Sequence, residues 1–161
     1  MTRSTPLRPK WLLIPASLLL SALAWAAPLQ TGDALPPMLL KDQHEQALAV
    51  GGDTRIIFFA AEMNTSKMMT KALEALPPTA LKDRKAIYIA DISSMPEPIS
   101  SIVAMPRMKK LPYTVAVVRY AKDVAHLPRK TGAVTVMSTT AGRMTAVSFV
   151  DTPEQIGAYL K

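Results

Sequence analysis

Residues 55–69 read RIIFFAAEMNTSKMM, and this stretch decides the fold class of the 161-residue chain. Residues 55–61 form a continuous apolar run that is too short for a typical helix and rich in strand-forming residues. Such a run is typical of a strand buried on both faces. Asn64, Thr65 and Ser66 are all favourable helix N-caps. The stretch therefore predicts a central strand that is followed at once by a helix.

The predicted helix has one apolar face and a clear end. Its face consists of residues at helical spacing, namely Met68, Met69, Ala72, Leu73 and Leu76. The helix stops at the Pro77-Pro78 pair, because proline donates no backbone hydrogen bond and restricts the residue before it. We therefore expect an amphipathic helix that packs on the sheet through its methionines and leucines.

The pattern of a strand followed by a helix repeats beyond this unit. Residues 85–92 form a second apolar strand, and Glu97-Pro98 has the composition of a helix start. This second helix is predicted to stop at Pro106. Its apolar stripe consists of Ile99, Ile102, Val103 and Met105. A third strand is expected over 113–120, and this alternation of strands and helices indicates a parallel sheet core.

Antiparallel elements are expected on both sides of this core. In chain order they are a short strand within 32–40, its partner 47–50, a hairpin formed by 133–137 and 144–149, and a helix that ends at Leu160. The last helix opens with a capping-box spacing between Asp151 and Glu154. The sequence therefore predicts an α/β domain with a mixed central sheet and a C-terminal antiparallel hairpin and helix.

The amino-terminal residues carry the pattern of an export signal. Three basic residues precede the apolar run 11–24, and a small-x-small motif follows at 24–26. The run is about 14 residues long, whereas a membrane-spanning helix needs roughly 20. We therefore expect a signal peptide at 1–26, cleavage near Ala26, and one mature domain at 27–161 that is periplasmic or secreted and has no stable membrane anchor.

The charge and cysteine content exclude several function classes. Removing the predicted signal peptide lowers the formal net charge from +7 to about +4, which is only mildly basic, so nucleic acid is not an expected partner. The chain contains no cysteine, which excludes disulfides and thiolate metal sites. We therefore expect stability to come from packing alone.

The order of elements and the segment 59–69 resemble the thioredoxin and peroxiredoxin-like superfamily, which implies a three-layer α/β sandwich for residues 27–161. Redox members of that superfamily have Cys-x-x-Cys at the helix start, where this chain has Asn64 and Lys67. They also have a cis-proline before the hairpin, where this chain has Gly132 within Thr131-Gly132-Ala133. Signal-bearing, cysteine-free chains of this layout resemble the YtfJ-type periplasmic family.

The missing thiols decide what the resemblance implies for activity. A thiolate at the helix N-terminus is the reagent of the redox families, and neither an amide nor an ammonium replaces it. We therefore expect neither thiol-disulfide oxidoreductase nor peroxidase activity. The favoured interpretation is a redox-inactive binding or accessory module in the periplasm, whose partner is a periplasmic protein or a small anionic ligand.

The candidate ligand or partner edge lies at the position of the superfamily's Cys-x-x-Cys. It consists of Glu62, Asn64, Thr65, Ser66, Lys67 and Asp91. Polar groups at the carboxyl ends of parallel strands and at a helix N-terminus can hold an anion, but Asn64, Thr65 and Ser66 can equally serve only as caps. Glu62 and Asp91 can act together in acid–base chemistry, or Asp91 can be a solvated strand end. The alternative function is therefore a non-thiol enzyme that uses this edge.

Metals and cofactors have little support in the sequence. Met63, Met68 and Met69 suggest a Cu(I) site, but the last two lie on the expected core stripe and are explained by packing. No flavin or dinucleotide fingerprint occurs. We therefore expect no metal and no cofactor, with metal or flavin association kept as a minor alternative. A basic cluster over 107–110 is either a solvated helix end or a contact for an acidic partner or anionic lipid.

Overall fold

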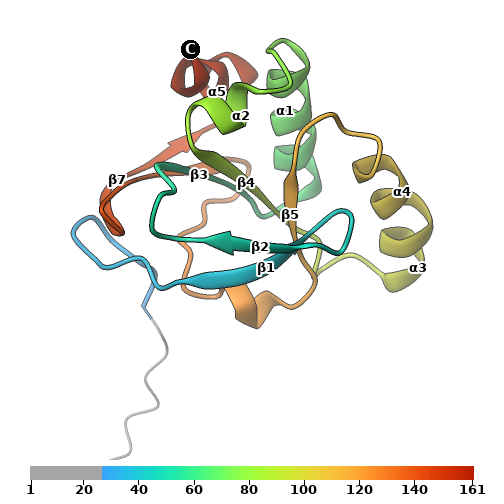
Figure 1. Cartoon of the computed structure of the whole chain (residues 1–161). Helices are drawn as coiled ribbons and strands as arrows, with labels where there is room; N and C mark the ends of the chain where they lie inside the picture. The colour runs from blue at the N-terminus through green and yellow to red at the C-terminus, as the bar shows by residue number, and fades with distance from the viewer. Residues whose placement is uncertain (1–26) are drawn as a thin grey trace, which may run out of the picture.

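The computed structural model describes residues 27–161, so the predicted signal peptide lies outside the described residues. A mixed seven-stranded sheet forms the centre of this part of the chain (Figure 1). The strands are β1 Met38–Asp42, β2 Ala47–Val50, β3 Ile56–Ala60, β4 Ala86–Asp91, β5 Val115–Val118, β6 Val134–Thr140 and β7 Arg143–Val150. The helices are α1 Met63–Glu74, α2 Ala80–Asp83, α3 Glu97–Ile99, the π-helical η1 Ser100–Ala104, α4 Met105–Met108, the 3-10 helix η2 Ala121–Val124 and α5 Pro153–Leu160.

The strand order across the sheet is β2-β1-β5-β4-β3-β6-β7. Strands β3, β4 and β5 are parallel neighbours, whereas β6 runs antiparallel to both β3 and β7. At the other side, β1 is antiparallel to β5 and β2. The predicted parallel core, the C-terminal hairpin and the pairing of 47–50 with the first strand are therefore confirmed.

Strand β3 is buried on both faces, as the apolar run predicts. Phe58 and Ala60 pack in one core cluster, and Ile57 and Phe59 pack in the other. Side chains alternate along a strand, so each face of the sheet has its own core. Helices α1 and α5 cover the first face, and η2 together with the amino-terminal segment covers the second (Figure 1).

Helix α1 begins earlier than the sequence suggests. Glu62 is the N-cap residue, and Asn64, Thr65 and Ser66 lie inside the first helical turn. The Thr65 hydroxyl accepts a hydrogen bond from the Glu62 backbone N–H at 3.0 Å and donates one to the Glu62 carbonyl at 2.8 Å. The prediction that Asn64, Thr65 or Ser66 is the N-cap is therefore wrong, because Thr65 binds the cap residue's backbone from within the helix.

The second predicted helix does not stop at Pro106. The helical segment α3-η1-α4 continues to Met108, and Pro106 lies near the start of α4. Proline donates no backbone hydrogen bond, and its ring crowds the preceding helical turn. The π-helical turn η1, which precedes Pro106, lets the helix accommodate the proline ring. Most of the apolar stripe faces outward, because Ile99, Ile102 and Val103 are exposed and only Met105 is buried.

Three boundaries differ in smaller ways. The third strand is shorter than 113–120, because Arg119 and Tyr120 are exposed beyond the end of β5. The hairpin turn contains only Ala141 and Gly142. At the last helix the N-cap is Thr152, whose hydroxyl accepts a hydrogen bond from the backbone N–H of Gln155. The Gln155 side chain accepts one from the Asp151 backbone N–H, so the capping partner is Gln155 rather than Glu154.

Among the described residues, no helix combines the length and the apolar character needed to cross a bilayer.

His126 links the amino-terminal segment to the body of the domain. Its backbone carbonyl accepts a hydrogen bond from the Leu29 N–H at 2.9 Å, and its Nε2 atom is buried without a hydrogen-bond partner among the described residues. Burial lowers the pKa of His126 from its ordinary value of 6.5, because the charged imidazolium is less well solvated inside the protein. The folded state therefore favours the neutral ring.

We expect the free energy of unfolding to fall as the pH drops below 6.5. The unfolded chain binds a proton on His126 before the folded chain does, so protonation favours unfolding in that window. Urea unfolding between about pH 7.5 and about pH 5.5 measures this loss. His126→Gln should flatten the dependence, whereas the matched change at the exposed His44, His44→Gln, should preserve it. An unchanged slope in His126→Gln would contradict the assignment.

Candidate functional site

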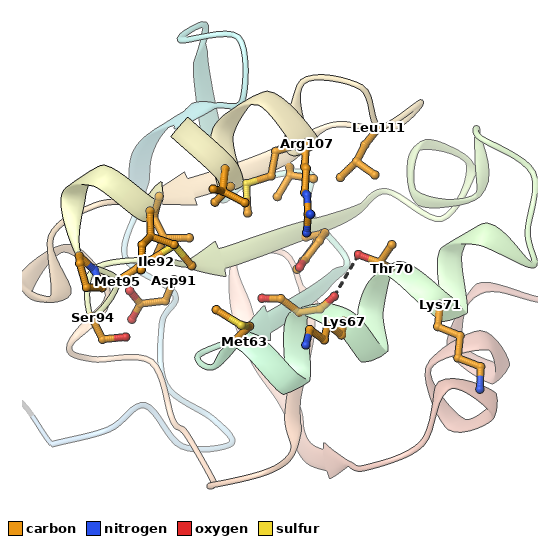
Figure 2. Close-up of a pocket in the computed structure, with 18 of the residues that line it drawn as sticks. Met63, Lys67, Thr70, Lys71, Asp91, Ile92, Ser94, Met95, Arg107 and Leu111 are labelled. Atoms are coloured by element: carbon orange, nitrogen blue, oxygen red, sulfur yellow. Dashed lines mark hydrogen bonds between the residues drawn. The ribbon is translucent and has the colours of Figure 1, made fainter. Parts of the chain in front are cut away.

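An open cleft of about 540 Å³ lies on the α1 face of the sheet (Figure 2). One wall is helix α1, the other is the helical segment α3-η1-α4, and Tyr88 of β4 and Val115 of β5 also line it. Both helical walls follow strands that end at the same edge of the sheet, because β3 and β4 are parallel neighbours. The βαβ connections therefore place the two walls side by side.

Most of the cleft surface is apolar. Its apolar lining includes Met63, Met95, Ile99, Val103, Met108 and Leu111. Several of these side chains lie far from full burial: Met63 is 55% exposed, Ile99 45% and Val103 41%. Apolar side chains that are exposed together around a hollow typically mark a binding surface rather than a core.

A few polar groups lie along the α1 side of the cleft. The Thr70 hydroxyl donates a hydrogen bond to the Ser66 carbonyl at 3.1 Å (Figure 2). Burial raises the pKa of Tyr88, and a hydrogen bond with the Ser66 side chain partly opposes this rise. Tyr88 therefore stays a neutral phenol at physiological pH, and it presents a weakly polar patch beside Ser66.

Three cations line the cleft from two different elements. Lys67 and Lys71 lie one turn apart on α1, and Arg107 comes from α4. Figure 2 shows the Arg107 side chain extending from α4 toward α1. Within residues 27–161 none of the three forms a salt bridge, and neither does Glu74, the carboxylate on the next turn of α1. The site therefore carries a net excess of positive charge.

Asp91 lies at the opposite end of the cleft from Lys71 (Figure 2). Its carboxylate is buried and forms a salt bridge with Arg129, with an Nη1–Oδ2 distance of 3.4 Å. It also accepts a hydrogen bond from the Ser93 backbone N–H at 2.9 Å. The Arg129 guanidinium in turn lies 5.1 Å from the centre of the Phe59 ring. The negative charge of Asp91 is therefore compensated locally.

The other carboxylate that the sequence singles out, Glu62, faces away from this cleft. Its Oε2 atom accepts a hydrogen bond from the Gly132 backbone N–H at 3.3 Å. Gly132 has φ +75°, a left-handed conformation that favours glycine, in the loop before β6. Glu62 therefore ties the start of α1 to this loop, and the structure engages Glu62 and Asp91 in separate interactions instead of pairing them.

The six residues of the predicted edge are thus divided by the structure. Ser66, Lys67 and Asp91 line the cleft, whereas Glu62, Asn64 and Thr65 do not. Thr65 is completely buried, and the Asn64 side chain is exposed and accepts from the Thr65 backbone N–H at 2.9 Å. Residues 62, 64 and 65 therefore organise the helix start.

Sequence reasoning missed the contributions of Lys71, Glu74 and the second wall of the cleft. Arg107 stands out in the sequence as part of a basic cluster, but the sequence does not show that its side chain extends toward α1. Ile99 and Val103 were visible as an apolar stripe, which has the same period whether it faces a core or a cleft. Only the amphipathic spacing of Lys67 and Lys71, on one side of α1, was a usable signal.

The methionine pattern follows the packing interpretation. Met69 is fully buried and Met68 packs against the same core cluster, as predicted. Met63 lines the cleft and is exposed, so it does not share the core packing of Met68 and Met69. Among the described residues no group of three histidine, cysteine or carboxylate side chains is placed to hold a metal ion.

Comparison with known proteins yields the fold and no sequence relative. No family model and no curated protein sequence matches the chain. A peroxiredoxin-like protein from Aquifex aeolicus superposes with a TM-score of 0.54 at 17% identity, over 84% of this chain and 88% of that one. A putative protein disulfide isomerase from Bacteroides thetaiotaomicron gives 0.58 at 12% identity, over 82% and 86%. The thioredoxin domain of a thiol-disulfide oxidoreductase from Bacteroides vulgatus gives 0.52 at 14%, over 83% and 99%.

The fold is thioredoxin-like. This agrees with the resemblance drawn from the sequence and with the mixed sheet and flanking helices seen in the structure. The thioredoxin-like domain has no cysteine anywhere in its chain, so it cannot form or exchange a disulfide. Asn64 and Lys67 lie at the start of α1, and Lys67 also lines the cleft beside it.

Proposed function

We propose that the protein is an exported, redox-inactive binding module that works in the periplasm and binds its ligand in the cleft between α1 and α3-η1-α4. The observation that carries this proposal is the open apolar cleft beside the start of α1 in a thioredoxin-like domain without cysteine. A cleft of about 540 Å³ lies within the range of about 300–1,000 Å³ that is usual for ligand sites.

Binding is favoured over catalysis by the state of the two carboxylates. Acid–base chemistry needs a group that is free to exchange a proton with a substrate. Glu62 is occupied by the Gly132 N–H outside the cleft, and Asp91 is buried against Arg129 and Ser93. The alternative, a non-thiol enzyme, would have to use Ser66, Lys67 and Asp91, which share the cleft.

The export part of the proposal rests on the sequence pattern of residues 1–26. Expression of the full chain in a Gram-negative host, followed by fractionation and intact mass measurement, tests it. We expect a periplasmic product whose mass corresponds to a chain that starts at Ala27. A full-length product in the cytoplasm would contradict export and leave the binding proposal to be judged separately.

Native mass spectrometry on the protein recovered from its own periplasm tests the binding function. We expect a non-covalent adduct that is lost in Val103→Asp, because this change puts a charge into the apolar wall. Ile102→Asp is the matched control, since Ile102 is exposed in the same helical segment but does not line the cleft. An adduct with the mass of a flavin or of copper would contradict the proposal.

Activity measurements complete this test. We expect no insulin disulfide reduction and no peroxide consumption above the rate without protein, because the chain has no thiol. Turnover of an ester or phosphoester that is lost in Lys67→Met or Asp91→Asn would favour the alternative, a non-thiol enzyme. These assays use the same periplasmic preparation, so binding and turnover are compared on one sample.

A further inference from the structure

The cleft combines a mostly apolar lining with three cations that form no salt bridge among the described residues, and this points to the chemistry of its ligand. Building on the proposed binding function, we propose that the cleft takes a monomeric anionic amphiphile. Such a ligand has one linear apolar chain and a single carboxylate, sulfonate or phosphate head. The chain would lie at the end with Met63 and Met95, and the head would lie beside Arg107, in the field of Lys67 and Lys71 of α1.

The apolar end accounts for the chain of the ligand. Figure 2 shows Met63, Ile92 and Met95 at this end, and Ile99 and Val103 of the helical segment also line the cleft. Methionine side chains are flexible, so they adapt to chains of irregular shape. Covering the exposed parts of Met63, Ile99 and Val103 removes apolar surface from water, which is the main favourable term for a lipid-like chain.

The cations account for the head of the ligand. Lys67 and Lys71 are like charges at i and i+4, an arrangement that is unfavourable by itself. Arg107 adds a third positive charge from the facing wall, and no described carboxylate lies within salt-bridge distance of any of the three. A single anionic group between the walls would relieve this repulsion, and the planar guanidinium suits a carboxylate or phosphate.

The carboxylates set the polarity of the ligand. Asp91 lies at the apolar end but is neutralised by Arg129, so it offers little attraction to a cationic head. Glu74 is the carboxylate of the cleft that has no salt bridge among the described residues, and it lies on the same helix as Lys71. It should weaken the binding of an anion, and its removal should therefore strengthen binding.

The helical segment α3-η1-α4 is suited to close over such a ligand. Only Met105 of its twelve residues, 97–108, is buried, whereas α1 buries four. A segment with few buried contacts opens locally at low cost in free energy. We expect its amides to exchange with solvent faster than those of α1 and to become protected when the amphiphile binds.

Calorimetric titration of the periplasmic protein, freed of any bound ligand, with three probes tests the proposal, each probe being kept below its solubility limit and its critical micelle concentration. The probes share a dodecyl chain and are dodecanoate, dodecanol and dodecyltrimethylammonium. We expect dodecanoate to bind at least about 10-fold more tightly than either of the others, which corresponds to about 1.4 kcal/mol. Bound dodecanoate should slow the hydrogen exchange of residues 97–108, which locates it in the cleft.

Charge variants identify the site of the head. The double variant Lys71→Gln with Arg107→Gln should weaken dodecanoate binding at least about 10-fold and leave dodecanol unchanged. Glu74→Gln should tighten dodecanoate binding, which a purely apolar cleft would not do. Lys109→Gln is the matched control, because Lys109 is exposed close to Arg107 but does not line the cleft.

Each remaining outcome overturns a distinct claim. Equal affinity for dodecanoate and dodecanol would overturn the anionic head and leave the binding module intact. Binding to phosphatidylglycerol vesicles without binding of dodecanoate would assign the cations to a membrane surface, and a peptide adduct in native mass spectrometry would assign the cleft to a protein partner. Either result overturns the amphiphile. Turnover without any bound ligand would overturn the proposed function itself.

Discussion

Replacing Phe58 by alanine should lower the free energy of unfolding by about 3–5 kcal/mol, one of the two largest losses that we expect from a single change in this domain. Phe58 lies in the middle of β3, an interior strand of the sheet, and none of its surface is exposed. Its ring meets the ring of Tyr159 of α5 edge-to-face, with centroids 6.3 Å apart. The truncation leaves a cavity between the sheet and its helices.

Urea unfolding followed by far-UV circular dichroism measures this loss of free energy. The matched control is Phe149→Ala, because Phe149 is 42% exposed on β7. The control should cost less than about 1 kcal/mol, since little packing is removed. Similar losses in the two variants would contradict the placement of Phe58 in the core between the sheet and helices α1 and α5.

Gln43→Leu should lower the free energy of unfolding by about 2–6 kcal/mol, because it leaves two buried backbone groups without a partner and each costs about 1–3 kcal/mol. Gln43 is buried in the turn after β1. Its amide nitrogen donates to the Tyr113 carbonyl at 2.8 Å, and its amide oxygen accepts from the Val115 N–H at 2.8 Å. Leucine has a similar size but satisfies neither backbone group.

Thermal and urea unfolding of Gln43→Leu measure the effect, and Gln46→Leu is the control. Gln46 is exposed in the same turn region, so leucine at this position removes no buried hydrogen bond. If Gln43→Leu were as stable as the control, the two hydrogen bonds to the backbone around β5 would contribute nothing to stability. The contact joins residues about 70 positions apart in the chain, so it also tests the seating of β1 beside β5.

The central strand and the first helix could be predicted because their patterns are local. A short apolar run with strand formers at 56–60 has few alternatives to a buried strand, and Met69, Ala72 and Leu73 repeat at the helical period. The cap position could not be predicted in the same way. Several favourable cap residues stand in a row, and the hydrogen bonds of Thr65 to the Glu62 backbone decide between them.

Part of the candidate site also followed from the sequence. Ser66, Lys67 and Asp91 were expected to meet because parallel strands β3 and β4 end at one edge, and all three line the cleft. Glu62 was expected there too, but its side chain turns to Gly132 instead. A backbone N–H in a distant loop leaves no signal beside Glu62 in the sequence, so this partner was not predictable.

The sequence by itself determined the chemistry that is excluded and the class of the fold. Thiol reactions need cysteine, and the absence of that residue holds whatever the structure. Only the tertiary structure decided that Ile99 and Val103 line a cleft and that Arg107 extends toward α1. It also decided that the Gln43 side chain forms hydrogen bonds with the backbone of Tyr113 and Val115. Periodicity shows which side of a helix is apolar, but its neighbour depends on how the parallel crossovers bring distant segments together.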